Sequence, residues 1–195
     1  MIHPHTELRF ISDEIGHGVV ATKLIPKGTI TWVQDQLDLV LTPDQVANMS
    51  NDYQQIIDYF TFRNNKGEYV LCWDMAKYVN HSFKSNCLTT PYDFEIAIRD
   101  IYPGEELTDD YGYLNIAKPF KAKDEGTRRK TVYPDDLLKY HSVWDKHLKE
   151  AFQDISSVNQ PLKTFLNPKM KRKVEKIDKG EAVLDSILTC YYADK

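Results

Sequence analysis

The 195-residue chain has few cysteines, only Cys72, Cys87 and Cys190. They are too few and too scattered for a disulfide framework. No two of them have the spacing of zinc ligands. The sequence therefore predicts free thiols, a reducing compartment and no metal site.

Long apolar runs are also missing. No stretch approaches the roughly 20 residues that span a bilayer, and residues 1–5 lack a basic region followed by an apolar one, as a secretory signal would have. We therefore expect no membrane partner and an intracellular protein, in the cytoplasm or the nucleus. A secreted effector stays open as an alternative.

The charges are unevenly distributed along the chain. The net charge of −4 combines 8 Lys/Arg and 17 Asp/Glu in residues 1–117 with 17 Lys/Arg and 12 Asp/Glu in residues 118–195. An acidic front half favours a cationic substrate and disfavours direct nucleic-acid binding. Solvated surface charge without a partner explains the same count equally well.

What is present in the front half is a series of short β-type segments separated by turns. Strands are predicted at residues 8–11, 18–22, 29–33, 37–41, 68–73 and 94–99. Residues 43–60 break this pattern, because their apolar residues recur at helical spacing. A hairpin turn is expected at residues 64–67.

The back half has a different pattern. Residues 118–134 are highly charged and nearly free of aliphatic side chains, which predicts a loop or linker. One helix is expected over residues 137–152, and a second from Pro168 to residue 191 with Gly180 as an interruption. The resulting division is residues 1–117, a linker at 118–134 and a helical extension at 135–195.

Three short strings carry the chemistry: Gly16-His17-Gly18, Asn80-His81-Ser82, and the run from Glu106 to Tyr113. Glycine lets a backbone approach a ligand closely, and Asn and His offer both donors and acceptors, which suits an amino-acid group. Each string also has an ordinary structural explanation, as a hairpin, a turn, or a pair of core tyrosines.

In this order and spacing, the strings resemble the SET-domain protein-lysine methyltransferases. The resemblance runs from about Leu8 to Tyr113 and rests on these pieces: Gly16-His17-Gly18-Val19, Ile25-Pro26-Lys27-Gly28, Asn80-His81-Ser82 with Asn86, and Gly104-Glu105-Glu106-Leu107-Thr108 before Asp110-Tyr111. It implies a mainly β fold with some α, a β-clip of small curved sheets with pseudoknot-like threading, C-terminal helices, and a variable insert at about residues 43–60.

The resemblance also implies S-adenosylmethionine as methyl donor. Residues Ile15, Gly16, His17 and Gly18 are then expected to pass along this cofactor. Asn80 would hold its amino-acid end, and the His81 backbone its adenine.

Tyr111 matches the catalytic tyrosine of the family and would also adjoin the cofactor. Asp109 and Tyr113 are expected beside the substrate. Many members carry Phe or Tyr at the position of Asp109, which influences how many methyl groups are added. Mono-, di- and trimethylation therefore all stay open.

Phe83 stands where many members have a zinc-binding Cys, and no Cys-x-Cys follows. The chain thus resembles the zinc-free type, in which a C-terminal helix closes the substrate channel. The two predicted helices could equally pad the domain or form a homodimer face.

The function that follows is methyl transfer to a lysine of a protein or peptide substrate, either a histone tail or another protein. The alternative is a catalytically silent SET-fold module that binds peptide or protein partners.

Overall fold

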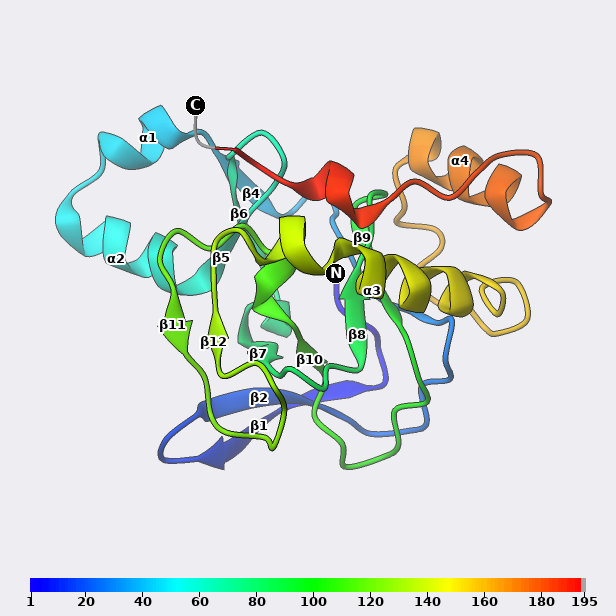
Figure 1. The fold of residues 1–195 in the computed structure, drawn as a ribbon, viewed down its shortest axis with the longest axis horizontal. Coiled ribbons are helices and arrows are strands. Elements are labelled where there is room, and N and C mark those ends of the chain that lie inside the picture. The colour runs from blue at the N-terminus through cyan, green and yellow to red at the C-terminus, as the bar shows by residue number, and fades with distance from the viewer. Residues whose placement is uncertain (194–195) are drawn as a thin grey trace.

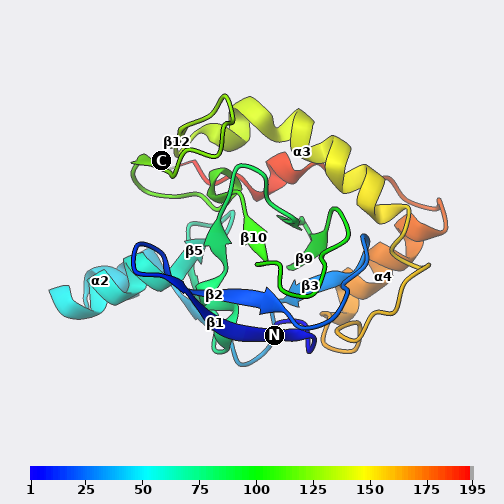
Figure 2. The same ribbon diagram turned by 90° about the horizontal axis from the view of Figure 1, so that it is seen from below.

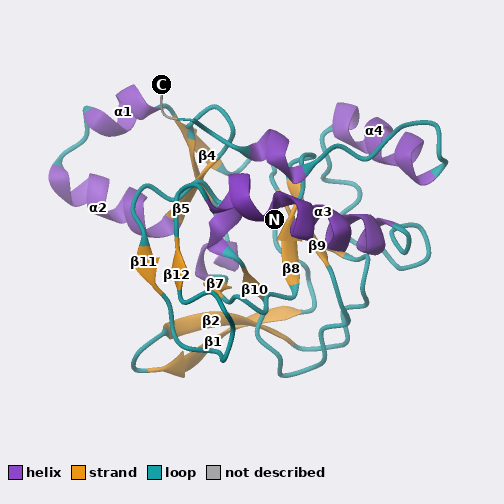
Figure 3. Ribbon diagram, in the orientation of Figure 1, coloured by secondary structure: helices purple, strands orange, loops and turns teal. Residues whose placement is uncertain are grey.

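Small β-sheets form the body of the molecule, with helices around them (Figures 1 and 3). The computed structural model describes residues 1–193. Its strands are β1 (Thr6–Ser12), β2 (Gly16–Ala21), β3 (Ile30–Val33), β4 (Leu39–Leu41), β5 (Thr61–Arg63), β6 (Tyr69–Leu71), β7 (Asn80–His81), β8 (Cys87–Thr89), β9 (Phe94–Ala97), β10 (Thr108–Asp109), β11 (Phe120–Lys121) and β12 (Thr131–Val132). Its helices are α1 (Pro43–Ala47), α2 (Asn51–Phe60), α3 (Asp136–Phe152) and α4 (Pro168–Asp178), with short 3-10 helices η1 (Met75–Tyr78), η2 (Tyr111–Tyr113) and η3 (Ile187–Cys190).

The sheets are mostly antiparallel and small. They are the β1–β2 hairpin, the three-stranded sheets β3-β9-β8 and β4-β6-β5, and the β11–β12 pair. β7 instead pairs in parallel with β10, with Thr108 opposite Asn80 and Asp109 opposite His81. This pairing lays two segments distant in sequence side by side.

The predicted strands are confirmed, each overlapping an observed one. The hairpin turn at residues 64–67 is confirmed as well, since the N–H of Gly67 donates to the carbonyl of Asn64 over 3.0 Å. The strand that enters this turn, β5, was not predicted.

The helical insert differs in detail from the prediction. Residues 43–60 form two helices rather than one, with a break at residues 48–50. Thr42 and Gln45 make a reciprocal capping box at the start of α1. Ser50, in extended conformation, begins α2 separately. Each helix therefore has its own start signal, and together they form one end of the molecule, opposite α4 (Figures 1 and 2).

The back half departs from the prediction at two places. Residues 118–134 are not only loop, because β11 and β12 pair within them. The last helix ends at Asp178, and Gly180 follows with φ +73°. That left-handed conformation suits glycine and ends a helix, so the chain continues in extended form to η3.

Residues from both halves share one core. The apolar face of α3, with Trp144 and Leu148, packs on Ile30, Leu88 and Ile96 of the β3-β9-β8 sheet. Burying such a side chain stabilises the fold by roughly 1.5–3 kcal/mol. α3 runs along the face opposite the β1–β2 hairpin (Figure 2). Of the alternatives left open for this helix, which were closing a channel, padding the domain or forming a dimer face, the packing of its apolar face within the chain favours padding.

The C-terminal segment is tied to the body by Asn115. The Asn115 Nδ2 group donates to the carbonyls of Arg63 and Cys190, both over 2.9 Å, and the N–H of Tyr192 donates to Asn115 Oδ1 over 2.9 Å. This fixes η3 beside β5. Within residues 1–193, no helix has the length and apolar character that crossing a bilayer requires.

Candidate functional site

The glycine string begins β2, directly after the turn that contains Ile15. Gly16 has φ +81°, which glycine adopts without strain. Gly18 is buried, and a Cβ added there would come within 2.9 Å of both Glu106 Cδ and Ile11 Cγ1. Only glycine leaves room for the Glu106 carboxylate at this place. His17 lies exposed between the two glycines.

Asn80 connects this string to the run from Glu106 to Tyr113. Its Nδ2 group donates to the carbonyl of His17 over 2.9 Å and to Glu106 Oε1 over 2.6 Å. The N–H of Leu107 donates to the carbonyl of Val19 over 2.7 Å, which holds the two segments together. The three strings therefore meet at one place.

His81 is held as a neutral ring in one tautomer. Its Nδ1 accepts a hydrogen bond from the N–H of Tyr111 over 3.2 Å, so the ring proton is on Nε2. Burial lowers the pKa of His81, although the Asp110 carboxylate opposes the shift. Among the described residues, the buried Nε2 atom has no hydrogen-bond partner. A buried donor of this kind is an open place for a ligand acceptor.

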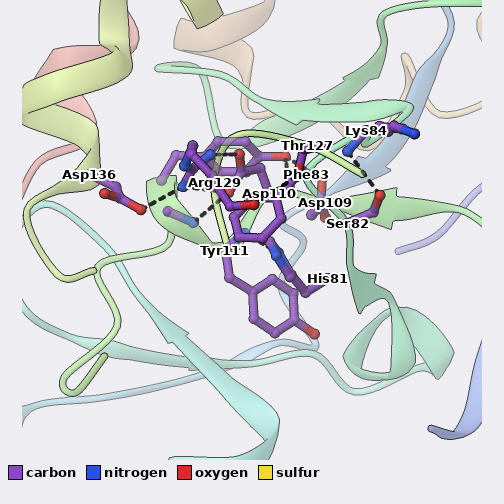
Figure 4. Close-up of polar contacts among 12 residues, drawn as sticks. His81, Ser82, Phe83, Lys84, Asp109, Asp110, Tyr111, Thr127, Arg129 and Asp136 are labelled. Atoms are coloured by element: carbon purple, nitrogen blue, oxygen red, sulfur yellow. Dashed lines mark hydrogen bonds and ion pairs between the residues drawn. The ribbon is translucent and has the colours of Figure 1, made fainter. Parts of the chain in front are cut away.

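Tyr111 lies beside His81 (Figure 4). Its hydroxyl donates to the carbonyl of Val79 over 2.7 Å. Burial, reinforced by the Asp109 carboxylate, raises the pKa of Tyr111 well above its usual range. The hydroxyl therefore stays protonated at neutral pH, and its lone pairs remain able to accept a hydrogen bond.

Aromatic rings surround His81. The ring centroids of Phe83 and Phe120 lie 4.5 and 5.5 Å from that of His81, and Phe120 lies 6.1 Å from Tyr111. Phe120 comes from β11, in the segment predicted to be a linker. An apolar wall of this kind suits a planar aromatic ligand group.

Arg129, in the same segment as Phe120 (residues 118–134), forms ion pairs beside the site. Its guanidinium bonds both carboxylate oxygens of Asp110 and contacts Asp136 Oδ2 over 2.5 Å (Figure 4). It lies over the rings of Phe83 and Tyr140 at 4.7 and 4.6 Å. Although burial lowers the pKa of Arg129, the bonds to the two aspartates raise it, so the charge persists.

Tyr113 and Asp109, predicted beside the substrate, are both buried. The Tyr113 hydroxyl lies 2.8 Å from Asp109 Oδ1 and 3.0 Å from the carbonyl of Cys87, and it accepts the N–H of Asp110 over 2.9 Å. The hydroxyl is thus engaged within the protein, and the ring of Tyr113 packs in the core, with its centroid 5.2 Å from that of Trp144.

Sequence reasoning missed three residues of this site. Glu106 was part of a quoted string but had no assigned role, and Phe120 and Arg129 lay in the supposed linker. Phe120 and Arg129 give no local signal in this charged segment, because their partners, His81 and Asp110, are distant in the sequence.

Comparison with known proteins identifies a family. The family model described as the SET domain matches residues 16–112. The matched range starts at Gly16 and ends directly after Tyr111, so it includes the first two strings and all of the third except Tyr113. No curated protein matches the chain. Among residues 1–193, no group of three or more His, Cys, Asp or Glu side chains is placed to hold a metal ion.

Proposed function

The chain belongs to the SET-domain family, and we propose that it transfers methyl groups from S-adenosylmethionine to lysine side chains of a protein. Proteins with this domain are typically protein-lysine methyltransferases. The observation that supports the proposal is the parallel β7–β10 pair, which sets Asn80 and His81 opposite Thr108 and Asp109 and brings the N–H of Tyr111 to His81 Nδ1.

The residues present fit the cofactor. Asn80 offers a carboxamide for its amino-acid end, Gly18 keeps the backbone free of a side chain, and the unpartnered His81 Nε2 offers a buried donor. Phe83 and Phe120 supply apolar surface for the adenine. S-adenosylmethionine supplies an electrophilic methyl group on a sulfonium.

Tyr111 is the proposed catalytic residue. Because its hydroxyl is neutral and donates to the carbonyl of Val79, it can accept a hydrogen bond from an amine and orient the nitrogen lone pair. Alignment of this kind supplies a large part of the rate in group transfer between two bound reactants. The lysine must arrive as a neutral amine, since its pKa in water is about 10.4.

The proposed substrate is a lysine-bearing protein, with histone tails as one candidate class. The acidic balance of residues 1–117 supports a cationic partner. The three free thiols support an intracellular place of action.

Two measurements test the proposal. Calorimetry with S-adenosylmethionine measures cofactor binding, and transfer of labelled methyl groups onto histones and onto a whole lysate measures activity. We expect binding, together with labelled lysine in at least one panel protein. Cofactor binding without transfer to any panel protein would instead favour a catalytically silent SET-fold binding module. The absence of binding would contradict the proposal that S-adenosylmethionine is the cofactor.

A further inference from the structure

The positive charge of the back half is concentrated at helix α4. Residues 163–179 hold 7 Lys/Arg against 2 Asp/Glu, a balance of +5, whereas the rest of residues 118–195 holds 10 of each. The expectation against direct nucleic-acid binding came from the acidic residues 1–117, and α4 lies outside them. The charge of this helix therefore needs an explanation of its own.

The two faces of α4 differ in character. Met170, Val174 and Ile177 form its apolar face, which packs on the core that α3 also shares. The other face carries four cations at spacings of three and four residues, which places them on one side of the helix. All four side chains are exposed, and we call them the α4 basic stripe: Lys169, Arg172, Lys176 and Lys179. Lys179 caps the helix with φ −79° and ψ −3°, so it continues the stripe.

The ion pairs around α4 do not neutralise the stripe. Glu175 pairs with Lys163 over 3.8 Å, and Lys173 pairs with Asp185 over 3.2 Å. Within residues 1–193, none of the four stripe cations forms an ion pair. The stripe therefore presents four positive charges to an external anion.

Helix stability does not account for the stripe. The first turn of α4 has no acidic residue and contains Lys169, although the partial positive charge of a helix N-terminus favours acidic side chains there. Like charges three or four residues apart also repel one another. Because this arrangement disfavours the isolated helix, it points to a ligand that compensates the charge.

The length of the stripe fits one strand of duplex DNA. From Lys169 to Lys179 the helix rises about 15 Å, at about 1.5 Å per residue. A DNA strand carries one phosphate about every 3.4 Å along the duplex axis, so about four phosphates lie within that length. A lipid surface fits less well, because the apolar face of α4 is packed in the core and cannot enter a bilayer.

The distribution of charge over the molecule favours an approach through α4. The insert at residues 43–60 holds 3 Asp/Glu and no Lys or Arg. It forms α1 and α2, at the end of the molecule opposite α4 (Figures 1 and 2). Separated charges orient a molecule in the field of a charged partner. A polyanion would therefore meet α4 first, with the acidic insert directed away from it.

We propose that the α4 basic stripe docks on the phosphate backbone of duplex DNA without reading its base sequence. Phosphate contacts of this kind position a protein on DNA but carry no sequence information. The stripe takes no part in the contacts around His81 and Tyr111, so docking does not depend on methyl transfer.

Fluorescence anisotropy of a labelled duplex of about 20 base pairs and mixed sequence measures binding by the full chain, between about 50 and 200 mM NaCl. Phosphate contacts release counterions, so the logarithm of the binding constant falls with the logarithm of the salt concentration, by about 0.9 for each contact. Four contacts give an expected slope of about −3.6. The absence of duplex binding at the lowest salt concentration would overturn the proposal.

Replacing the stripe tests its location. The combined variant carries four substitutions to glutamine, which keeps a good helix propensity: Lys169→Gln, Arg172→Gln, Lys176→Gln and Lys179→Gln. We expect its affinity at the lowest salt concentration to fall by about tenfold or more. Each single substitution should make the salt slope shallower by about 0.9. Far-ultraviolet circular dichroism checks folding, and the single variants keep the test decisive if the combined variant does not fold.

The matched control loses the same net charge at four exposed lysines outside α4: Lys23→Gln, Lys66→Gln, Lys118→Gln and Lys123→Gln combined. We expect its affinity to stay within about threefold of wild type. An equal loss in both combined variants would show that binding follows net charge rather than the stripe, and it would overturn the proposal.

Poly-L-glutamate distinguishes a phosphate backbone from an acidic polypeptide. At equal charge concentration, we expect the duplex to bind about tenfold more tightly or better. Equal or tighter binding of poly-L-glutamate would overturn the assignment to DNA. None of these measurements uses methyl transfer, so a failure of the proposed function and a failure of DNA docking are distinguishable.

Discussion

The main-chain N–H of Tyr111 donates to Nδ1 of His81, over 3.2 Å. This single bond joins two of the sequence strings and fixes the His81 tautomer, so the proposed methyl-transfer residue and the proposed cofactor contact are set by the same interaction. A change at either residue is therefore expected to affect the other.

Removing only the Tyr111 hydroxyl separates catalysis from binding. In Tyr111→Phe, the ring still packs against His81, but the group that orients the amine is gone. We expect S-adenosylmethionine affinity within about threefold of wild type and turnover reduced by about 100-fold or more, in the range measured for loss of one precisely placed polar group. Calorimetry and labelled methyl transfer measure the two. Tyr102→Phe, at an exposed tyrosine, is the control, and equal turnover in Tyr111→Phe would remove Tyr111 from the chemistry.

Gly18→Ala tests whether the cofactor binds beside the backbone at Gly18. The new Cβ meets the Glu106 carboxylate and Ile11, so Glu106 must move and its bond to Asn80 is disturbed. We expect S-adenosylmethionine affinity to fall by about tenfold or more, equivalent to about 1.4 kcal/mol, as measured by calorimetry. Unchanged affinity would mean that the cofactor does not use this place.

Arg129 is expected to be a determinant of stability. In Arg129→Ala, Asp110 and Asp136 lose the cation that compensates their buried charges. Breaking a buried ion pair costs about 3–5 kcal/mol, so the free energy of unfolding in urea should fall by about that amount. The neighbouring Arg128→Ala is the matched control, because Arg128 is exposed. A loss in Arg129→Ala no larger than in this control would show that the ion pairs of Arg129 with Asp110 and Asp136 contribute little to stability.

The buried carboxyl of Asp109 predicts the direction of one pH effect on stability. Burial raises the pKa of Asp109 in the folded protein to about 6, above its value in the unfolded chain. The stability associated with the protonated Asp109 carboxyl is therefore fully present below about pH 4 and is lost as the pH rises through 6.

Asp109→Asn should accordingly reduce the fall in unfolding free energy between pH 5 and pH 8, by on the order of 1–3 kcal/mol. Urea unfolding at the two pH values measures it, with Asp13→Asn in the exposed β1–β2 turn as control. An identical fall in wild type and Asp109→Asn would contradict the raised pKa.

Six of the strands (β1, β2, β3, β4, β6 and β9) and the main helices were predictable because their signals are local. Alternating β-type runs, turn residues and the apolar stripe of α3 depend on neighbours within a few positions. Such local patterns did not predict the parallel β7–β10 pair, because its two strands are far apart in the sequence. The meeting of these segments was expected only from the resemblance to a family.

The parts that were missed depend on tertiary contacts. Arg129 and Phe120 gave no local signal, and their positions follow from Asp110 and His81, which the folded chain brings to them. Likewise, the sequence marked Asp109 as unusual, but its place opposite His81 in the β7–β10 pair follows only from the folded chain.

The parallel β7–β10 pair has a consequence for the order of folding. Each strand is two residues long, too short to persist alone, and joining them requires closing the chain that contains β8 and β9. The pair should therefore form late, after the β3-β9-β8 sheet is in place. For the same reason, this strand pair should open early when the protein unfolds. Asn80, His81 and Tyr111 would then gain or lose their arrangement together, as one cooperative unit.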